Sequence, residues 1–211
     1  MFVGYEYPTD ATATRNKERK MLIKNALHHF SNVYGKEGRA EFDNGTLVFN
    51  PDLYDANKSD AANFMNTLHP SHNLIAIGNP FNLFFFQSWD DMQNHRGWLD
   101  GKDEHFLYLL NQDDQPILID SETGELFAMT FGTNEKFPIA QTLADFICVL
   151  SDMMDISIKY IAANTIDGEC DENYFLNEDE DYLAEIQQLL DCAELKINRE
   201  NLYSFLFVGT L

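Results

Sequence analysis

The sequence lacks the short motifs by which many nucleotide-binding and hydrolytic enzymes are identified. It contains no Gly-x-x-x-x-Gly-Lys loop, no Gly-x-Gly-x-x-Gly, no His-Glu-x-x-His and no Gly-x-Ser-x-Gly. Its acidic stretches also fail the calcium-loop template, which places a glycine at the sixth position among alternating acids. Residue chemistry therefore gives an enzyme no support, and we expect neither a cofactor nor a metal ion.

Cysteine is scarce, and long apolar runs are missing. The three cysteines, Cys148, Cys170 and Cys192, are an odd number without a Cys-x-x-Cys spacing, which is typical of reduced thiols. The longest apolar runs, such as 83–86 and 146–150, fall far short of the roughly 20 residues that a membrane-spanning helix needs. The N-terminus has no basic segment followed by an apolar one, so no signal peptide is predicted. We expect a cytoplasmic protein that does not bind a membrane.

Positive charge is also scarce. Lys and Arg number 14 against 35 Asp and Glu, which gives a net charge of −21. Residues 1–60 are nearly balanced, whereas residues 167–194 hold eleven acids and no base. A surface this negative repels phosphate backbones and anionic lipid and attracts basic proteins, which argues against direct binding to nucleic acid. Solubility alone explains the charge equally well.

The chain does contain ample apolar material for one packed α+β domain. Of its 211 residues, 45% are hydrophobic and 13% aromatic. Three apolar segments between Phe106 and Phe131 predict three strands joined by two tight turns. Pro116 belongs at the start of the second strand, because it cannot donate to a sheet, and Gly124 supplies a positive φ in the second turn. We expect this meander to form the centre of a mostly antiparallel sheet flanked by helices.

Further helices and strands are predicted on the N-terminal side of the meander. The predicted elements are a helix over 14–34, a hairpin over 40–49, short helices over 60–68 and 88–95, and strands over 74–77 and 82–86. The first helix has apolar positions that include Leu22, and a basic beginning whose charges oppose the helix dipole. We expect those charges to pair within the chain, for instance with its acidic C-terminal part.

The C-terminal side is predicted to be helical. Thr142 caps a helix, Asp145 reciprocates, and an apolar stripe follows on one face. Beyond Asp155 the pattern weakens, and we expect a separate second helix, an acidic loop over 167–173 and a further helix over 182–190. An apolar terminal segment over 205–208 is expected to dock. We therefore treat 1–211 as one domain, with a core at about 74–155, an N-terminal helix and hairpin at 12–50, and a helical acidic extension at 156–211.

Several residues are candidates for a functional site, and each also has a structural explanation, either turn formation or core packing. His69 and His72 are spaced like metal ligands, but Pro70 between them predicts an irregular turn. Cys148 sits beside a core stripe, where a cysteine packs as a small apolar residue. The carboxylates that fall in predicted turns are Asp113, Asp114, Asp120, Glu122 and Glu125. They could act as an acid/base pair, but turn formation explains them better.

The order of features between residues 74 and 150 resembles the SUKH superfamily, which includes the Smi/Knr-like cell-wall regulators of fungi and many bacterial immunity proteins. The matching segments are Leu74–Gly78, Phe106–Leu110, Pro116–Asp120, Thr123–Leu126 and Ile139–Ile147. They correspond to a strand that ends in glycine, central strands with an acidic turn, and a capped helix containing a phenylalanine. The match covers about 80 of 211 residues. The chain departs from the family in its acidic segment after Asp155 and in lacking a clear Trp-rich opening motif.

The resemblance implies a non-enzymatic binding protein that neutralises a toxin, often a nuclease, delivered by competing bacteria. The charge agrees, because a nuclease carries a basic face that an acidic inhibitor can cover. The expected acidic contacts are Asp167, Glu169, Asp171, Glu172, Glu178, Asp179, Glu180 and Asp181. Trp89 and Trp98 are candidate aromatic anchors, although core burial explains them equally well. Two alternatives stay open: a regulatory or scaffolding module for endogenous partners, and a hydrolase that uses the turn carboxylates.

Overall fold

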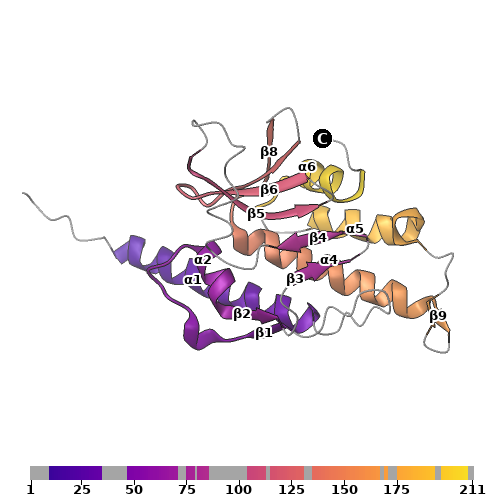
Figure 1. Cartoon of the computed structure of the whole chain (residues 1–211), viewed down its shortest axis with the longest axis horizontal. Helices are drawn as coiled ribbons and strands as arrows, with labels where there is room; N and C mark the ends of the chain where they lie inside the picture. The colour runs from indigo at the N-terminus through magenta and orange to yellow at the C-terminus, as the bar shows by residue number, and fades with distance from the viewer. Residues whose placement is uncertain are drawn as a thin grey trace, which may run out of the picture.

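The computed structural model describes residues 10–34, 47–70, 75–78, 80–85, 104–112, 115–130, 135–166, 169–170, 175–192 and 196–208. The strands are β1 (Leu47–Phe49), β2 (Leu68–Pro70), β3 (Ile75–Ile77), β4 (Leu83–Phe85), β5 (Phe106–Gln112), β6 (Gln115–Asp120), β7 (Leu126–Met129), β8 (Lys136–Ala140), β9 (Thr165–Ile166) and β10 (Glu169–Cys170). The helices are α1 (Asp10–Tyr34), α2 (Asp60–Thr67), α4 (Leu143–Ala163), α5 (Glu180–Cys192) and α6 (Arg199–Tyr203), with helical turns η1 (Pro51–Leu53), η3 (Leu176–Glu178) and η4 (Ser204–Val208) (Figure 1). Among these described helices, none is long and apolar enough to cross a membrane.

The centre of the fold is an antiparallel sheet in which each strand pairs with the next along the chain, in the order β3-β4-β5-β6-β7-β8. Strand β6 begins at Gln115, so Pro116 is its second residue and lies near the strand start, where it was predicted. Gly124 has a φ of 79°, which confirms the expected turn between β6 and β7. The α+β class and the central antiparallel meander are therefore confirmed.

The central strands are buried on both faces, which explains their nearly continuous apolar sequences. Leu110 and Ile117 face the main core, whereas Leu118, Phe106 and Met129 form a separate apolar cluster. Since β5 and β6 lie in the middle of the sheet, each needs apolar residues at successive positions. The nearly continuous apolar sequence of the meander thus follows from its central position in the sheet.

Helix α4 is the element that joins the rest of the molecule to the sheet. It packs against α1 and α5 and also contacts β8 (Figure 1). Ten of its residues are buried, and the eight apolar ones share one continuous core with residues of α1, α2, the sheet, α5 and η4. The predicted docking of the terminal apolar segment is confirmed, since Phe205 and Leu206 are buried and the Gln112 amide donates to the Leu206 carbonyl at 3.0 Å.

Aromatic packing fixes the N-terminal elements on the same core. Phe30 of α1, Phe64 of α2 and Phe85 of β4 contact one another, with ring centroids 5.1–6.1 Å apart. All three rings are almost fully buried. Three elements distant in sequence therefore meet at one cluster, and α1 is held close to the edge of the sheet.

Hydroxyl side chains cap α2 and α4, and the cap predicted at Thr142 is confirmed. The Ala62 N–H donates to Ser59 Oγ at 3.2 Å, and the Asp145 N–H donates to Thr142 Oγ1 at 3.1 Å. The Thr142 hydroxyl in turn donates to Asp145 Oδ2 at 2.6 Å. The first turns of α2 and α4 are thus stabilised by the residues that the sequence places there.

Two expectations about the helices are wrong. Helix α4 continues without a break to Ala163, where a separate second helix was expected beyond Asp155. Ser157 interrupts its apolar pattern, but this serine is buried and its hydroxyl bonds to the Met153 carbonyl at 2.9 Å. In α1, Leu22 is 59% exposed whereas its neighbour Ile23 is fully buried. At this point of the helix, Ile23 and not Leu22 faces the core.

The predicted turn at His69 needs revision, whereas the second arm of the predicted hairpin over 40–49 is strand β1. Strand β1 pairs with β2, so Val48 lies opposite His69 and Leu47 opposite Pro70. His69 and Pro70 belong to a strand instead of an irregular turn. The Asn-Gly turn, the first arm of the hairpin, His72 and the short helix predicted over 88–95 lie outside the described residues.

Replacing Thr142 tests whether its side-chain cap stabilises the first turn of α4. We expect Thr142→Ala to lower the free energy of unfolding by about 1 kcal/mol, because the Asp145 N–H loses its acceptor. Denaturant unfolding with an unchanged slope measures this loss. Thr142→Ser keeps the hydroxyl and is the matched control. Equal stability of the alanine and serine variants would show that the cap is dispensable.

Candidate partner-binding surface

Four of the eight predicted acidic contacts lie together where α5 begins. Glu178 ends η3, Asp179 precedes α5, and Glu180 and Asp181 occupy its first turn. We call residues 178–181 the acidic segment. Glu178, Glu180 and Asp181 are exposed, whereas Asp179 is half-buried. The structure therefore gathers half of the predicted acids at one place.

The other predicted contacts are placed less fully. Glu169 lies in β10, which pairs with β9 to form a two-stranded hairpin, and nothing is described of its side chain. The predicted contacts outside the described residues are Asp167, Asp171, Glu172, Trp89 and Trp98. The candidate surface rests on the acidic segment and the residues around it.

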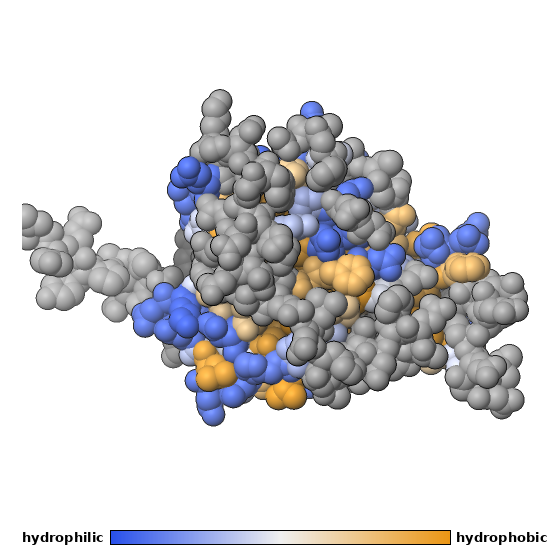
Figure 2. Space-filling view, in the orientation of Figure 1, coloured by the Kyte–Doolittle hydropathy of each residue, from blue (hydrophilic) through white to orange (hydrophobic). Residues whose placement is uncertain are grey.

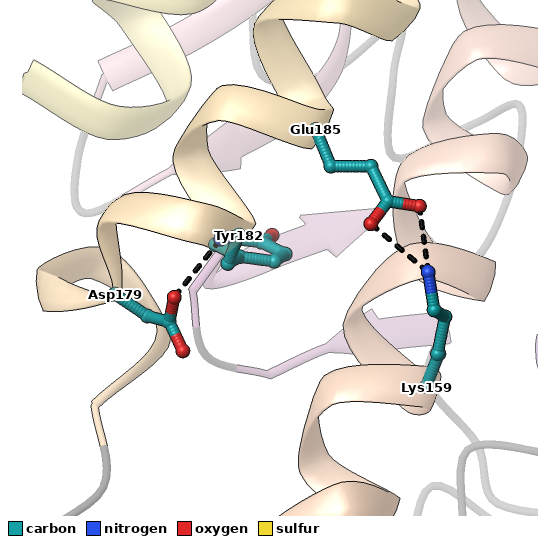
Figure 3. A network of polar contacts seen from close by, with 4 residues as sticks. All are labelled: Lys159, Asp179, Tyr182 and Glu185. Atoms are coloured by element: carbon teal, nitrogen blue, oxygen red, sulfur yellow. Dashed lines mark hydrogen bonds and ion pairs between the residues drawn. The ribbon is translucent and has the colours of Figure 1, made fainter.

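The sequence folds into this arrangement because Asp179 caps α5. Its Oδ1 accepts the Tyr182 N–H at 2.9 Å (Figure 3). Its backbone carbonyl accepts the Leu183 N–H at 3.0 Å. Acidic residues in the first turn are further stabilised by the helix dipole. One short run thus contains a structural carboxylate and three carboxylates that point to solvent.

Buried contacts attach the start of α5 to α4. Tyr182 is fully buried, and its hydroxyl lies 2.9 Å from Ser157 Oγ on α4. Its ring makes edge contacts with Tyr160 of α4 and Phe207 of η4, at centroid distances of 5.5 and 6.3 Å. A hydroxyl pair in an apolar interior fixes the position of both partners, since leaving either one unbonded is costly. The backbone next to the acidic segment is therefore held in place by packing against α4.

A second link between α4 and α5 lies at the surface. Lys159 Nζ donates to both carboxylate oxygens of Glu185, at 2.9 and 3.0 Å, and this contact lowers the pKa of Glu185 (Figure 3). The pKa of the Tyr160 hydroxyl is raised, first by burial and then by its hydrogen bond to Glu185. Lys159 is thereby engaged by Glu185, and within the described part of the chain no ion pair reaches Glu178, Glu180 or Asp181. Their negative charge stays available to a partner.

The backbone at the basic beginning of α1 lies away from the acidic segment. In Figure 1 the first turns of α1 lie at the left-hand end of the long axis, whereas β9 and the start of α5 lie toward the right. The side chains of residues 10–21 lie outside what the structure describes, so the expected pairing of those basic residues within the chain stays a prediction. The two oppositely charged stretches lie on different parts of the molecule.

Sequence reasoning missed an exposed aromatic residue at this surface. Phe175 directly precedes η3 and is 48% exposed, whereas its neighbour Leu176 is buried. Figure 2 shows hydrophobic surface beside strongly hydrophilic surface where α5 starts. The sequence signal for this residue is an apolar triplet at 174–176 inside the acidic run 167–194. The tryptophans were predicted instead because interface hot spots favour that residue type.

The turn carboxylates behave as turn-forming residues. Asp120 Oδ1 accepts the N–H groups of Glu122 at 2.8 Å and Thr123 at 3.2 Å. Burial opposes ionisation of Asp120, but these hydrogen bonds outweigh it and lower its pKa. A carboxyl general acid needs a raised pKa, so Asp120 is shifted in the wrong direction for the hydrolase alternative. Asp113 and Asp114 lie outside the described residues.

Other possible sites give little chemistry. A cavity of about 350 Å³ lies between residues 54–61 and the turn after β6. Burial raises the pKa of Cys148 to about 11, with help from the carboxylates of Asp152 and Asp145, so this thiol is protonated at neutral pH. The part of the chain that the structure describes contains no group of three or more His, Cys, Asp or Glu placed to hold a metal ion.

The role of Asp120 predicts an acid-dependent loss of stability. Because its folded pKa lies below its ordinary value of 3.8, the ionised form stabilises the protein above that pH, and the contribution disappears as the pH falls through the lowered pKa. We expect Asp120→Asn to lower the free energy of unfolding by about 1–2 kcal/mol at neutral pH. The difference from wild type should shrink as the pH falls below 3.8.

Denaturant unfolding across this pH range measures the effect. Glu122→Gln, which neutralises an exposed carboxylate in the same turn, controls for the change in net charge. If the stability difference between Asp120→Asn and wild type stayed constant with pH, the stabilising role of the ionised carboxylate would be contradicted. A loss of packing alone does not depend on protonation.

Comparison of the chain with protein-family models, with curated proteins and with solved structures finds no match. Membership in the SUKH superfamily therefore stays a prediction from the sequence.

Proposed function

We propose that this chain is an immunity protein that binds a basic toxin through the acidic segment and thereby neutralises it. The observation that carries the proposal is a set of three exposed carboxylates, at Glu178, Glu180 and Asp181, without an ion pair in the described part of the chain. They stand on a helix start that is fixed to the core. The proposed location is the cytoplasm, where a nuclease toxin reaches nucleic acid.

Charge gives this surface a physical function. A nuclease needs a basic face to hold the phosphate backbone, and the same face attracts a protein of net charge −21. Complementary charge accelerates association and covers the face that nucleic acid needs. An inhibitor of this kind blocks the toxin without any chemistry of its own.

Rigidity favours the same function. Asp179 caps α5, Tyr182 is buried against Ser157, and Lys159 pairs with Glu185. The exposed carboxylates therefore start from a defined backbone position, and less conformational entropy is lost when a partner binds. Acidic residues that served solubility alone would not need a backbone fixed by these contacts.

Charge reversal of the acidic segment tests the proposal. The candidate partner used in this test is the product of the gene immediately upstream, co-expressed with the chain. We expect the combined variant Glu178→Lys, Glu180→Lys, Asp181→Lys to lower the association rate about tenfold or more at low salt and to weaken its salt dependence. Stopped-flow binding measures both quantities. Asp179 is left unchanged because it caps α5.

The matched control reverses three exposed acids elsewhere, with Asp52→Lys, Glu104→Lys and Glu122→Lys, so that the net charge changes equally. Equal losses in the two combined variants would mean that total charge matters and the acidic segment does not. An unchanged association rate in the first variant would remove this surface from the proposal. Copurification of housekeeping proteins alone would favour the regulatory or scaffolding alternative.

A further inference from the structure

We propose that Phe175 is the apolar anchor of this surface and inserts into an apolar pocket that lysine and arginine side chains surround on the partner. The inference rests on the proposed function and deepens it, because it names the partner chemistry that the acidic segment alone leaves open. A basic rim would meet Glu178, Glu180 and Asp181, while the pocket would take the phenyl ring.

Exposure singles out this side chain. The large apolar side chains that are exposed in the described part of the chain are Leu22, Val48, Leu53, Phe84 and Phe175. Among them, Phe175 directly precedes the turn that leads into the acidic segment. Aromatic residues dominate binding energy where they become fully buried at the centre of an interface. A half-exposed phenylalanine beside uncompensated carboxylates has the composition of such a centre.

The backbone under Phe175 is fixed. Its carbonyl accepts the Glu178 N–H at 3.0 Å, and the Leu176 carbonyl accepts the Asp179 N–H at 3.2 Å. Leu176 is only 4% exposed and belongs to the main core. Since the next side chain points inward, the Phe175 ring cannot turn into the core without displacing it. A ring held outward, with two rotatable bonds, loses little entropy on binding.

The two components of the surface affect different rates. Exposed charges steer encounter, so they set the association rate and its dependence on salt. A desolvated aromatic anchor acts after encounter and sets the dissociation rate. Loss of Phe175 and loss of the acids therefore have distinguishable signatures.

The probe is a phage-displayed library of random peptides selected against the full-length chain. We expect wild type to enrich peptides that combine lysine or arginine with apolar residues, and Phe175→Ala to lose that enrichment. Phe84→Ala, which removes a second phenylalanine of similar exposure, 41%, from β4, is the matched control and should behave as wild type. Phe175→Leu keeps an apolar side chain and should retain part of the enrichment.

Kinetics with the enriched peptides, made synthetically, give the second readout. Phe175→Ala should raise the dissociation rate about tenfold or more while it leaves the salt dependence of association unchanged. Basic peptides enriched equally by wild type and Phe175→Ala would overturn the anchor and leave the proposed function standing. No enrichment of basic peptides on wild type would overturn both.

Discussion

Burial of α4 is the constraint on which the rest of the structure depends. Ten of its residues are buried, and they cover most of the helix circumference, so no single neighbour can shield it from water. The sheet, α1 and α5 each cover part of it, and one continuous core results. Even Ser151 and Ser157, which are polar, are buried in this helix and satisfied by the carbonyls of the preceding turn. The elements before and after the meander are therefore parts of one packed body.

This constraint also explains why a strongly acidic stretch is ordered. Repulsion among neighbouring carboxylates opposes a compact fold, and Glu178 to Asp181 are four acids in succession. Asp179 offsets part of that cost by capping α5, and Tyr182 and Ile186 are fully buried in the core. Beyond α5, just before α6, the Asn198 N–H donates to the Ile139 carbonyl of β8 at 2.8 Å. Packing on α4 and on β8 thus holds the charged surface in place.

Local chemistry made part of this fold predictable from the sequence. The turn at Gly124 and the cap at Thr142 depend on neighbouring residues alone, so both were predicted correctly. Elements set by distant contacts were not. Helix α4 was expected to end early because Ser157 interrupts its apolar pattern. The hydroxyl that pairs with Ser157 belongs to Tyr182, 25 residues later, and the local sequence does not reveal it. Likewise, nothing local shows that Phe175 points outward, since that follows from the burial of Leu176 against the main core.

The central claim is that the acidic segment stands on a part of the chain that unfolds together with the sheet. Native-state hydrogen exchange tests it directly, by comparing the amides of Ile186 and Leu190 in α5 with those of Phe146 and Leu150 in α4. We predict that both sets exchange through global unfolding, with the same opening free energy and the same response to denaturant. A much lower opening free energy for the α5 amides, insensitive to denaturant, would contradict the claim and show that the acidic surface opens independently of the core.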